Sequence, residues 1–470
     1  MEKNHPRSLC ESPLHEVVEG KKLRTPPFSP LQHLLEGLGV VLLLTTSPAA
    51  AQIKVDVTDE SGNDMTIAVP VMPTPAVAQT EAGTTEALGR QVAHVVAADL
   101  KGSGLFKPVG PAGLPGISFA EVTAPNFAYW PGTGAVALVQ GFVRANAGGE
   151  ITVGCYLYDV ALKTELTRAG YVLPARDWRR GAHKCADAIY ARLSGESPFF
   201  DSRVAYIAET GPKDHRVKRL AIMDSDGANH RFLTNGQNIV LTPRFSPDYK
   251  SILYLSYANK RPRIYVYNLG TGQQRLVTES ANQTLAPRWS PDGRTILYSM
   301  SVAGNTDIYS IPAAGGTPRK LTNSPGIDVG GSFSPDGRRI VFESDRSGKQ
   351  QLYVMDADGS NQQRISFGGG AYATPEWSPR GDLIAYTKLA GNFRIGVMTP
   401  GGQGERLLTN SWQDESPTWS PNGRVIQFFR TSQGRGGKSS LWQVDLTGVN
   451  ERRLPTPVDG SDPTWGPLLP

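Results

Sequence analysis

Short apolar runs separated by polar turn residues fill the second half of the chain, and they recur at a nearly constant distance. Most of them follow the signature aromatic-Ser-Pro, which reads in full Trp289-Ser290-Pro291-Asp292-Gly293 in one copy. Its aromatic residues stand at positions 245, 289, 333, 377, 419 and 465, so the copies are 42 to 46 residues apart. Proline presets the backbone of a turn, aspartate bonds to nearby amides, and glycine accepts the conformation that follows. The pattern predicts a repeated unit that contains a tight turn.

Each repeat holds enough β-rich segments for four short strands. The runs that directly follow the turns lie at 252–254, 296–298, 340–342, 384–386 and 426–428. A second apolar run comes next, and a signature such as Arg319-Lys320-Leu321-Thr322 recurs in phase and indicates a third strand. The stretch before each aromatic residue supplies a fourth. Four strands in roughly 45 residues are typical of a β-propeller blade.

Six copies predict a six-bladed β-propeller over residues 203–470. Val204-Ala205-Tyr206 resembles the strand that follows the turn, although no such turn precedes it. Trp465-Gly466-Pro467 resembles the turn, although no strand follows it. The two ends complement each other, so we expect one blade to take strands from both. Such closure removes exposed sheet edges.

Residues 52–195 lack the repeat and predict a small N-terminal α/β domain. Apolar residues near helical spacing predict helices over 84–100 and 177–193, and apolar runs predict strands over 67–71, 135–143 and 151–160. The expected architecture is therefore a two-domain chain that is mainly β overall.

The first 51 residues have the order of a secretory leader. Basic residues precede an apolar run at 38–44, and small residues follow it up to Ala51. The run is too short to span a bilayer, and its order predicts a signal peptide that is removed near Ala51. An ordinary buried helix is the alternative. We therefore expect export to the periplasm and a mature chain that starts at Gln52.

Composition and charge narrow the chemistry. The net charge of +5 is small and evenly spread, so the chain does not predict nucleic-acid binding. In an oxidising compartment Cys155 and Cys185 could form a disulfide, and two unpaired thiols are the alternative. No Cys-x-x-Cys or Gly-x-Ser-x-Gly motif occurs, and His183 on a predicted helix is interpreted as a packing or surface residue. We expect neither a cofactor, a metal site nor catalytic residues.

What remains is a binding ring. In a propeller the loops round the central channel form a concave docking face, and function concentrates on such loops. We expect this mouth to consist of the loop segments 240–242, 283–286, 328–330, 371–374, 414–416 and 460–462. These segments differ between copies while their flanks repeat. Neutral drift is the alternative explanation for any single position.

Several segments outside the repeat make the pattern specific. Ile67-Ala68-Val69-Pro70-Val71, the segment 98–108 and the segment 183–190 resemble the TolB family, periplasmic components of the Tol–Pal system of Gram-negative bacteria. The resemblance covers essentially residues 52–470. It implies a non-enzymatic, monomeric adaptor that binds the peptidoglycan-associated lipoprotein Pal through the propeller mouth and TolA through its N-terminal segment. Such an adaptor is peripheral to the outer membrane through Pal, and it supports outer-membrane integrity and invagination during cell division.

The family's contact positions can be transferred to this chain. The Pal-facing positions implied by the resemblance are Leu241, Thr242, Gln283, Leu285, Ala286, Val329, Gly330, Ala373, Thr374, Glu415, Ser416 and Asp462. The implied TolA-binding arm comprises Gln52, Ile53, Lys54, Val55, Asp56 and Val57. The chain departs from the family pattern at Gly330-Gly331, where a Glu-Pro or similar pair is common.

Two other functions stay open at this point. One is a secreted propeller hydrolase or lyase with the channel carboxylates of Asp328, Asp414 and Glu415 as acid and base. The other is a glycan-binding module.

Overall fold

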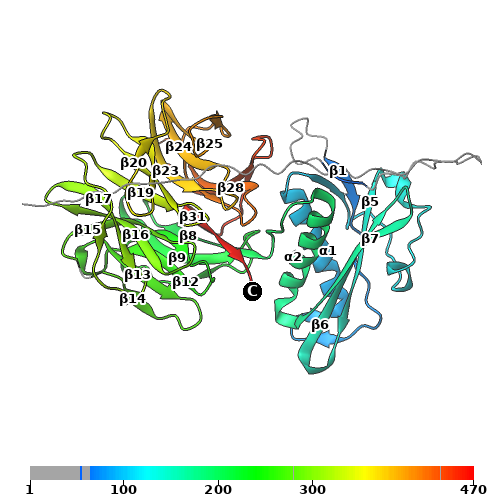
Figure 1. The fold of residues 1–470 in the computed structure, drawn as a ribbon. Coiled ribbons are helices and arrows are strands. Elements are labelled where there is room, and N and C mark those ends of the chain that lie inside the picture. Colours follow the sequence, from blue (N-terminus) through cyan, green and yellow to red (C-terminus); the bar gives the residue numbers. More distant parts are fainter. Residues whose placement is uncertain (1–52, 56–63, 279, 435) are drawn as a thin grey trace, which may run out of the picture. The chain divides into compact units, whose positions relative to one another are not determined.

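The fold is taken from a computed structural model that describes residues 53–55, 64–278, 280–434 and 436–470. Residues 51–470 form one compact unit. It contains an N-terminal α/β region followed by a six-bladed β-propeller (Figure 1), which confirms the predicted fold class. The expected leader, residues 1–51, lies outside the described residues. None of the helices in the described part is both long and apolar enough to cross a membrane.

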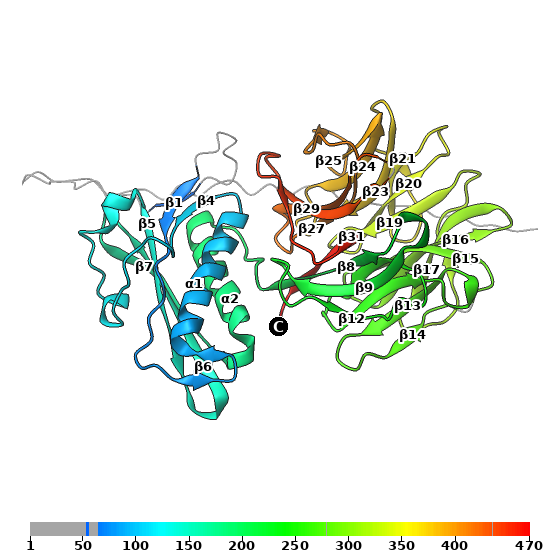
Figure 2. The same ribbon diagram turned by 180° about the vertical axis from the view of Figure 1, so that it is seen from behind.

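The N-terminal domain is a five-stranded sheet with two helices, ordered β4-β1-β5-β6-β7. Its strands are β1 Met65–Ala68, β4 Phe106–Val109, β5 Ala137–Ala145, β6 Glu150–Asp159 and β7 Thr164–Pro174, with a small hairpin of β2 Gln79–Thr80 and β3 Gly83–Thr84. Its helices are α1 Thr85–Gly102 and α2 Trp178–Ser194, which lie side by side against the sheet (Figure 2).

The helices form where the pattern predicts them, and their apolar faces build the domain core. The Thr84 side chain accepts a hydrogen bond from the amide of Ala87 and so caps α1. Leu88 and Val92 of α1 and Ile189 of α2 are buried in one cluster with the sheet. Strand β7 was not predicted, because as an edge strand it keeps several side chains exposed and lacks a clear apolar run.

The propeller consists of six four-stranded antiparallel sheets. In blades 2 to 6 the innermost strand is the first one in chain order, because it contacts the first strand of the neighbouring blade. In blade 1 the innermost strand is β31. The blades contain β8 Ser202–Thr210, β9 Val217–Asp224, β10 Arg231–Phe232 and β31 Asp459–Leu468 (blade 1); β11 Val240–Phe245, β12 Ser251–Ser256, β13 Arg263–Asn268 and β14 Gln274–Leu276 (blade 2); β15 Gln283–Trp289, β16 Thr295–Val302, β17 Asn305–Pro312 and β18 Arg319–Lys320 (blade 3); β19 Asp328–Phe333, β20 Arg339–Ser344, β21 Gln351–Asp356 and β22 Gln363–Arg364 (blade 4); β23 Ala371–Trp377, β24 Ile384–Ala390, β25 Asn392–Met398 and β26 Arg406–Leu407 (blade 5); and β27 Asp414–Trp419, β28 Val425–Thr431, β29 Ser439–Asp445 and β30 Arg452–Arg453 (blade 6).

Short 3-10 helices lie in the connections. They comprise Ala120–Val122, Trp130–Thr133, Ala147–Gly149, Ala175–Asp177, Lys213–His215 and Ala258–Lys260.

The ring closes by joining the two ends of the propeller, as the sequence predicted. Strand β31 pairs antiparallel with β8, and Trp465 lies opposite Val204. The indole of Trp465 also donates a hydrogen bond to the Ser202 hydroxyl at 2.8 Å. Blade 1 is therefore assembled from both ends and has four strands, like the other five blades.

The Ser-Pro-Asp-Gly turns have the predicted chemistry. In blade 3 the Ser290 hydroxyl donates to the Asp292 carboxylate at 2.5 Å and accepts from the Thr295 amide at 2.9 Å. Gly293 donates its amide to the Ser290 carbonyl and has a φ of +70°. Glycine adopts this left-handed conformation without steric cost. Each turn thus connects an innermost strand to the second strand of its blade.

Candidate functional site: the propeller mouth

The six segments predicted as mouth loops are strands. They form the inner strands β11, β15, β19, β23, β27 and β31, so the prediction that they are loops is wrong. In β19, Val329 pairs with Glu343 and Ser332 pairs with Val341, which leaves two inner residues opposite one partner. The other five inner strands shift register at the same place. Each is a β-bulge, in which a strand gains one residue and bends.

The first bulge residue has a left-handed backbone in all six blades. The φ values are 47° at Thr242, 47° at Ala286, 71° at Gly330, 49° at Thr374, 55° at Ser416 and 47° at Asp462. Five of these residues precede a proline, which lacks an amide hydrogen and is tolerated at bulges. Blade 4 has Gly331 instead, and its left-handed residue is glycine. Non-glycine residues with positive φ are uncommon and cluster at functional sites.

The bulge makes neighbouring residues accessible. In five blades two successive residues are partly exposed and the next is buried, as with Leu241, Thr242 and Pro243. In β31 only Asp462 is open, because Ser461 is buried. All twelve residues named for the mouth lie on the inner strands, and Gln283 at the start of β15 is exposed. The structure thus brings these residues into one ring.

Hydrogen bonds from blade to blade hold the ring together. The amide of Thr374 in blade 5 donates to the Glu343 carboxylate of blade 4 at 3.2 Å. The amide of Ser416 in blade 6 donates to the Thr387 hydroxyl of blade 5 at 3.3 Å. Left-handed residues therefore use their free amides to bind the preceding blade.

Glu343 fills the space that Gly330 leaves. A Cβ atom at Gly330 would lie 3.1 Å from the Glu343 Oε1 atom. Burial raises the pKa of Glu343 to about 8, although the hydrogen bond from the Thr374 amide acts in the opposite direction. The Gly330-Gly331 departure from the other blades therefore accommodates a buried carboxyl group behind the mouth.

Four exposed apolar side chains lie in connections at the mouth end of the propeller. Ile239, Ile327, Phe367 and Trp412 are 48%, 46%, 73% and 49% exposed. They lie in the loops that lead into β11, β19, β23 and β27, so the antiparallel topology puts them at the end where inner strands begin. We call these four residues the apolar rim. The sequence analysis missed them, although apolar residues in otherwise polar connections were the available signal.

Beyond the bulges, three charged residues stand at the same position of their inner strands. Arg244 in β11, Arg288 in β15 and Glu376 in β23 stand two residues after their left-handed neighbours. Arg288 of blade 3 forms an ion pair with Glu376 of blade 5 and so reaches past blade 4. Glu376 also accepts a hydrogen bond from the Thr418 hydroxyl at 2.8 Å. Burial alone would raise the pKa of Glu376, but Arg288 and Arg244 hold it below its usual value. We call Arg244, Arg288 and Glu376 the channel neck.

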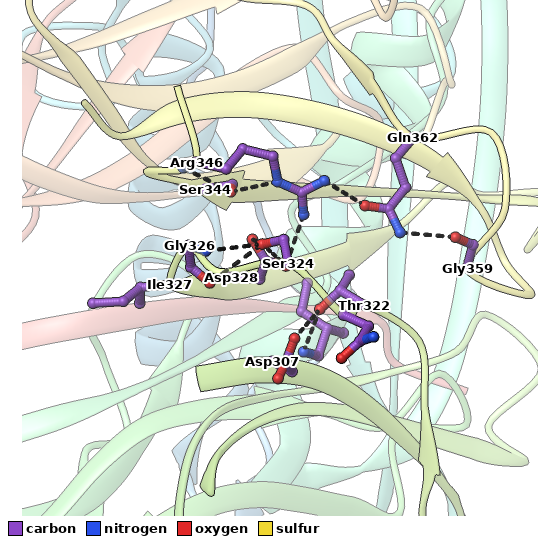
Figure 3. Close-up of polar contacts among 12 residues, drawn as sticks. Asp307, Thr322, Ser324, Gly326, Ile327, Asp328, Ser344, Arg346, Gly359 and Gln362 are labelled. Carbon is purple, nitrogen blue, oxygen red and sulfur yellow. Dashed lines mark hydrogen bonds and ion pairs between the residues drawn. The ribbon is translucent and has the colours of Figure 1, made fainter. Parts of the chain in front are cut away.

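Two of the three carboxylates considered as acid and base are already engaged. Asp328 is fully buried and accepts from Arg346 at 2.7 Å and from the Ser324 hydroxyl at 3.1 Å (Figure 3). Arg430 binds both oxygens of Asp414, at 2.6 and 2.9 Å. Asp328 thus pairs with an arginine of the turn after β20, and Asp414 pairs with an arginine of β28, so each carboxylate binds within its own blade. This arrangement does not favour the hydrolase or lyase alternative.

The described part of the N-terminal arm lies on α2. The Val55 amide donates to the Leu193 carbonyl at 3.0 Å, and Ile53 and Val55 pack against the core of the domain. Lys54 between them is exposed. The other arm residues, Gln52, Asp56 and Val57, lie outside the described residues.

A disulfide connects β6 to α2. Cys155 and Cys185 are bonded to each other and are buried in the core of the N-terminal domain. The bond fixes the helix to the middle of β6.

His183 is a buried charge and not a surface residue. Its Nδ1 atom lies 2.7 Å from the Asp99 carboxylate, and both side chains are nearly inaccessible. Burial alone would lower the pKa of His183, but Asp99 raises it to about 9. The sequence interpretation missed this pair because the two residues are 84 positions apart.

Asp226 completes a group of three possible metal ligands with Asp99 and His183, within 4.8 Å of one another. Arg179 forms ion pairs with Asp226 and Asp224. Guanidinium and imidazolium therefore already balance the carboxylates, which favours an ion-pair cluster over a metal centre.

Linker contacts lie at the propeller end that carries the Ser-Pro turns. Glu196 forms ion pairs with Arg380 and Arg424, which belong to the turns of blades 5 and 6. The Asn422 side chain donates to the Ser197 carbonyl at 2.9 Å. The bulges and the apolar rim are at the other end of the inner strands.

Both regions of the chain match family models. Residues 190–469 match the model described as the TolB beta propeller domain, and residues 53–166 match the TolB amino-terminal domain.

Similar proteins agree with these matches. A Zymomonas mobilis protein named Tol-Pal system protein TolB is 71% identical over 418 residues, which cover 89% of this chain and 91% of that protein. Tol-Pal system protein TolB 1 of Novosphingobium aromaticivorans is 71% identical over 442 residues, covering 91% and 98%. The crystal structure of TolB from Acinetobacter baumannii aligns with a TM-score of 0.74 at 28% identity, covering 86% of this chain and 97% of that one. The bulged six-bladed propeller, its α/β domain and these relatives agree, and the chain belongs to the TolB family of Tol–Pal system proteins.

Proposed function

We propose that this Tol–Pal component is a periplasmic adaptor that binds Pal at the propeller mouth and TolA through its N-terminal arm. By connecting the two it supports outer-membrane integrity and invagination during division. The basis of this proposal is the Tol–Pal role that follows from the family assignment. An adaptor role fits better than catalysis, because Asp328 and Asp414 are already paired with arginines.

The single observation that carries the proposal is the structure of the propeller mouth. Six left-handed bulges form a ring of accessible inner-strand positions, and the four residues of the apolar rim lie in connections at the same end of the propeller. Exposed apolar side chains that gather at one end of a molecule are typical of a protein interface. Phe367 and Trp412 are the largest of them, and large aromatic residues often dominate binding energy.

The proposal is tested by calorimetry with the chain from residue 52 onward and the soluble domain of Pal from the same genome. Replacing both Phe367 and Trp412 by alanine is expected to weaken Pal binding by at least about tenfold, since aromatic anchors are common hot spots. The matched control is Leu407→Ala, an exposed leucine of the outer strand β26 that is 41% accessible. Unchanged Pal affinity in the double variant, or an equal loss in the control, would contradict the proposed mouth.

The arm is tested in the same assay with TolA. Deleting residues 52–57 removes the segment whose Val55 amide binds α2. We expect TolA binding to be lost while the thermal midpoint of the propeller stays unchanged. TolA binding at full affinity after the deletion would exclude the arm as its contact.

A further inference from the structure

One arginine of the channel neck has no acidic partner. Arg244 follows the bulge of β11 and is partly buried. Its Nη1 atom donates to the carbonyl of the adjacent Pro243 at 2.6 Å, and its Nε atom is buried without a hydrogen-bond acceptor. Within the described part of the chain, Arg244 forms no ion pair with any carboxylate. A buried cation that lacks a partner is costly.

The equivalent arginine of blade 3, and arginines at other places in blades 4 and 6, are paired. Arg288 of blade 3 is joined to Glu376, Arg346 of blade 4 to Asp328, and Arg430 of blade 6 to Asp414. Arg244 departs from this pattern, although it occupies the same register as Arg288. Of the two arginines that occupy this position on the inner strands, Arg288 is therefore paired and Arg244 is not.

The groups around Arg244 do not neutralise its positive charge. Burial and the nearby Arg288 lower the pKa of Arg244 to about 9, whereas Glu376 and Asp462 act in the opposite direction. At neutral pH the side chain is still a cation. Glu376 is engaged by Arg288, and Asp462 accepts the Thr242 amide at 3.4 Å. An added anion would therefore meet a preformed and uncompensated donor group.

We propose that Arg244 binds a carboxylate that the docking partner carries into the channel on an aspartate or glutamate side chain. The planar guanidinium offers parallel N–H donors that match the two oxygens of a carboxylate. Aspartate and glutamate are the anionic side chains that a protein segment supplies. Arg244 lies two residues past the open pair Leu241 and Thr242, so a segment seated at the mouth reaches it next. This inference rests on the proposed function and names the chemistry of its contact.

The first experiment is a double-mutant cycle with Pal. Arg244→Gln is expected to weaken Pal binding by about tenfold or more, because a charge-assisted bond at a desolvated site is lost. Each aspartate and glutamate of Pal is then replaced by its amide. One of these substitutions should weaken binding to the unaltered chain and have little further effect on Arg244→Gln. Unchanged affinity in Arg244→Gln, or full additivity for every Pal substitution, would overturn the inference while Pal binding itself stands.

Two further variants separate this contact from general charge and from misfolding. Arg261→Gln removes an exposed cation from the loop between β12 and β13 at the same end of the propeller. It should change Pal affinity by less than about twofold, as expected for a screened rim charge. Arg244→Lys keeps the charge without the fork and should bind Pal with intermediate affinity. Equal losses in Arg261→Gln and Arg244→Gln would show a general electrostatic effect and contradict the site.

A second experiment needs no Pal. Succinate should raise the thermal midpoint of the unaltered chain more than sodium chloride of equal ionic strength, and Arg244→Gln should lose this difference. If the unaltered chain fails to bind Pal, the proposed function fails, and this measurement then decides the inference alone. A rise that Arg244→Gln loses supports a carboxylate site, and no rise overturns it.

Discussion

Six residues of the mouth hold a backbone conformation that L-amino acids rarely adopt. A left-handed backbone costs a non-glycine residue roughly 1–2 kcal/mol. The surrounding structure must therefore stabilise this conformation at Thr242, Ala286, Thr374 and their equivalents. Proline after the residue and a bond from its amide to the preceding blade offset part of this cost. At Gly330 the conformation is free of strain, and the space is used by Glu343 instead. Single residues thus decide how each blade presents its mouth positions.

The buried pair of His183 and Asp99 predicts a pH-dependent stability. The folded-state pKa of His183 is about 9, above the usual value of 6.5. The stabilisation is therefore complete below pH 6.5 and is lost as the pH rises through 9. We expect the free energy of unfolding to fall by on the order of 3 kcal/mol across this window. Urea denaturation at closely spaced pH values measures it.

The control for this prediction is His183→Gln, which cannot titrate. It should be less stable than the unaltered chain at pH 6.5, and the difference should shrink by pH 9.5. Glu343 also titrates in this range, with a pKa of about 8, so the comparison between the two proteins carries the result. Parallel pH profiles for both would show that the imidazole does not contribute.

The outermost strands of the blades are short, and a hydroxyl side chain that follows them explains why. They span only two or three residues, such as β18 Arg319–Lys320 and β22 Gln363–Arg364. The threonine or serine that ends the signature accepts a bond from the third strand, as Thr322 does from the Ile308 amide at 3.0 Å. A hydroxyl there replaces the next backbone partner, so the ladder stops.

Thr322→Val is therefore expected to destabilise blade 3, although valine has nearly the same shape as threonine. It leaves the buried Ile308 amide without its acceptor and removes a bond to Asp307. The expected loss is about 1–3 kcal/mol of unfolding free energy. Thr317→Val, at an exposed position of the same blade, should change stability by less than about 0.5 kcal/mol. Chemical denaturation of both variants checks the prediction, and equal effects would contradict it.

For the whole molecule, the decisive contact is between the two ends of the propeller. Strand β31 supplies the inner strand of blade 1, and Phe199 of the linker packs against Trp465 with ring centroids 5.9 Å apart. The same face receives the linker residue Glu196 through Arg380 and Arg424. Ring closure and attachment of the N-terminal domain are thus located together, away from the mouth.

Removing residues 459–470 is expected to open the ring. The edge of β8 would lose its partner, and exposed strand edges promote association between chains. We expect the shortened chain to lose its cooperative thermal transition and to elute as aggregates in size-exclusion chromatography. Removal of Pro470 alone is the control and should leave both properties unchanged. A shortened chain that melts cooperatively and elutes like the intact one would show that closure is dispensable.

The sequence by itself determined the repeat, the turns, the two helices of the first domain and the joining of the propeller ends. These features depend on local chemistry, such as the bonds of Ser290 and Asp292, which one stretch of chain contains completely. The tertiary structure decided that the mouth segments are bulged strands, because a register shift is defined only by the partner strand. It also decided that Arg288 pairs with Glu376, that His183 pairs with Asp99 and that Arg244 stays unpaired. The paired residues are far apart in the chain, so no local pattern records which charges burial brings together.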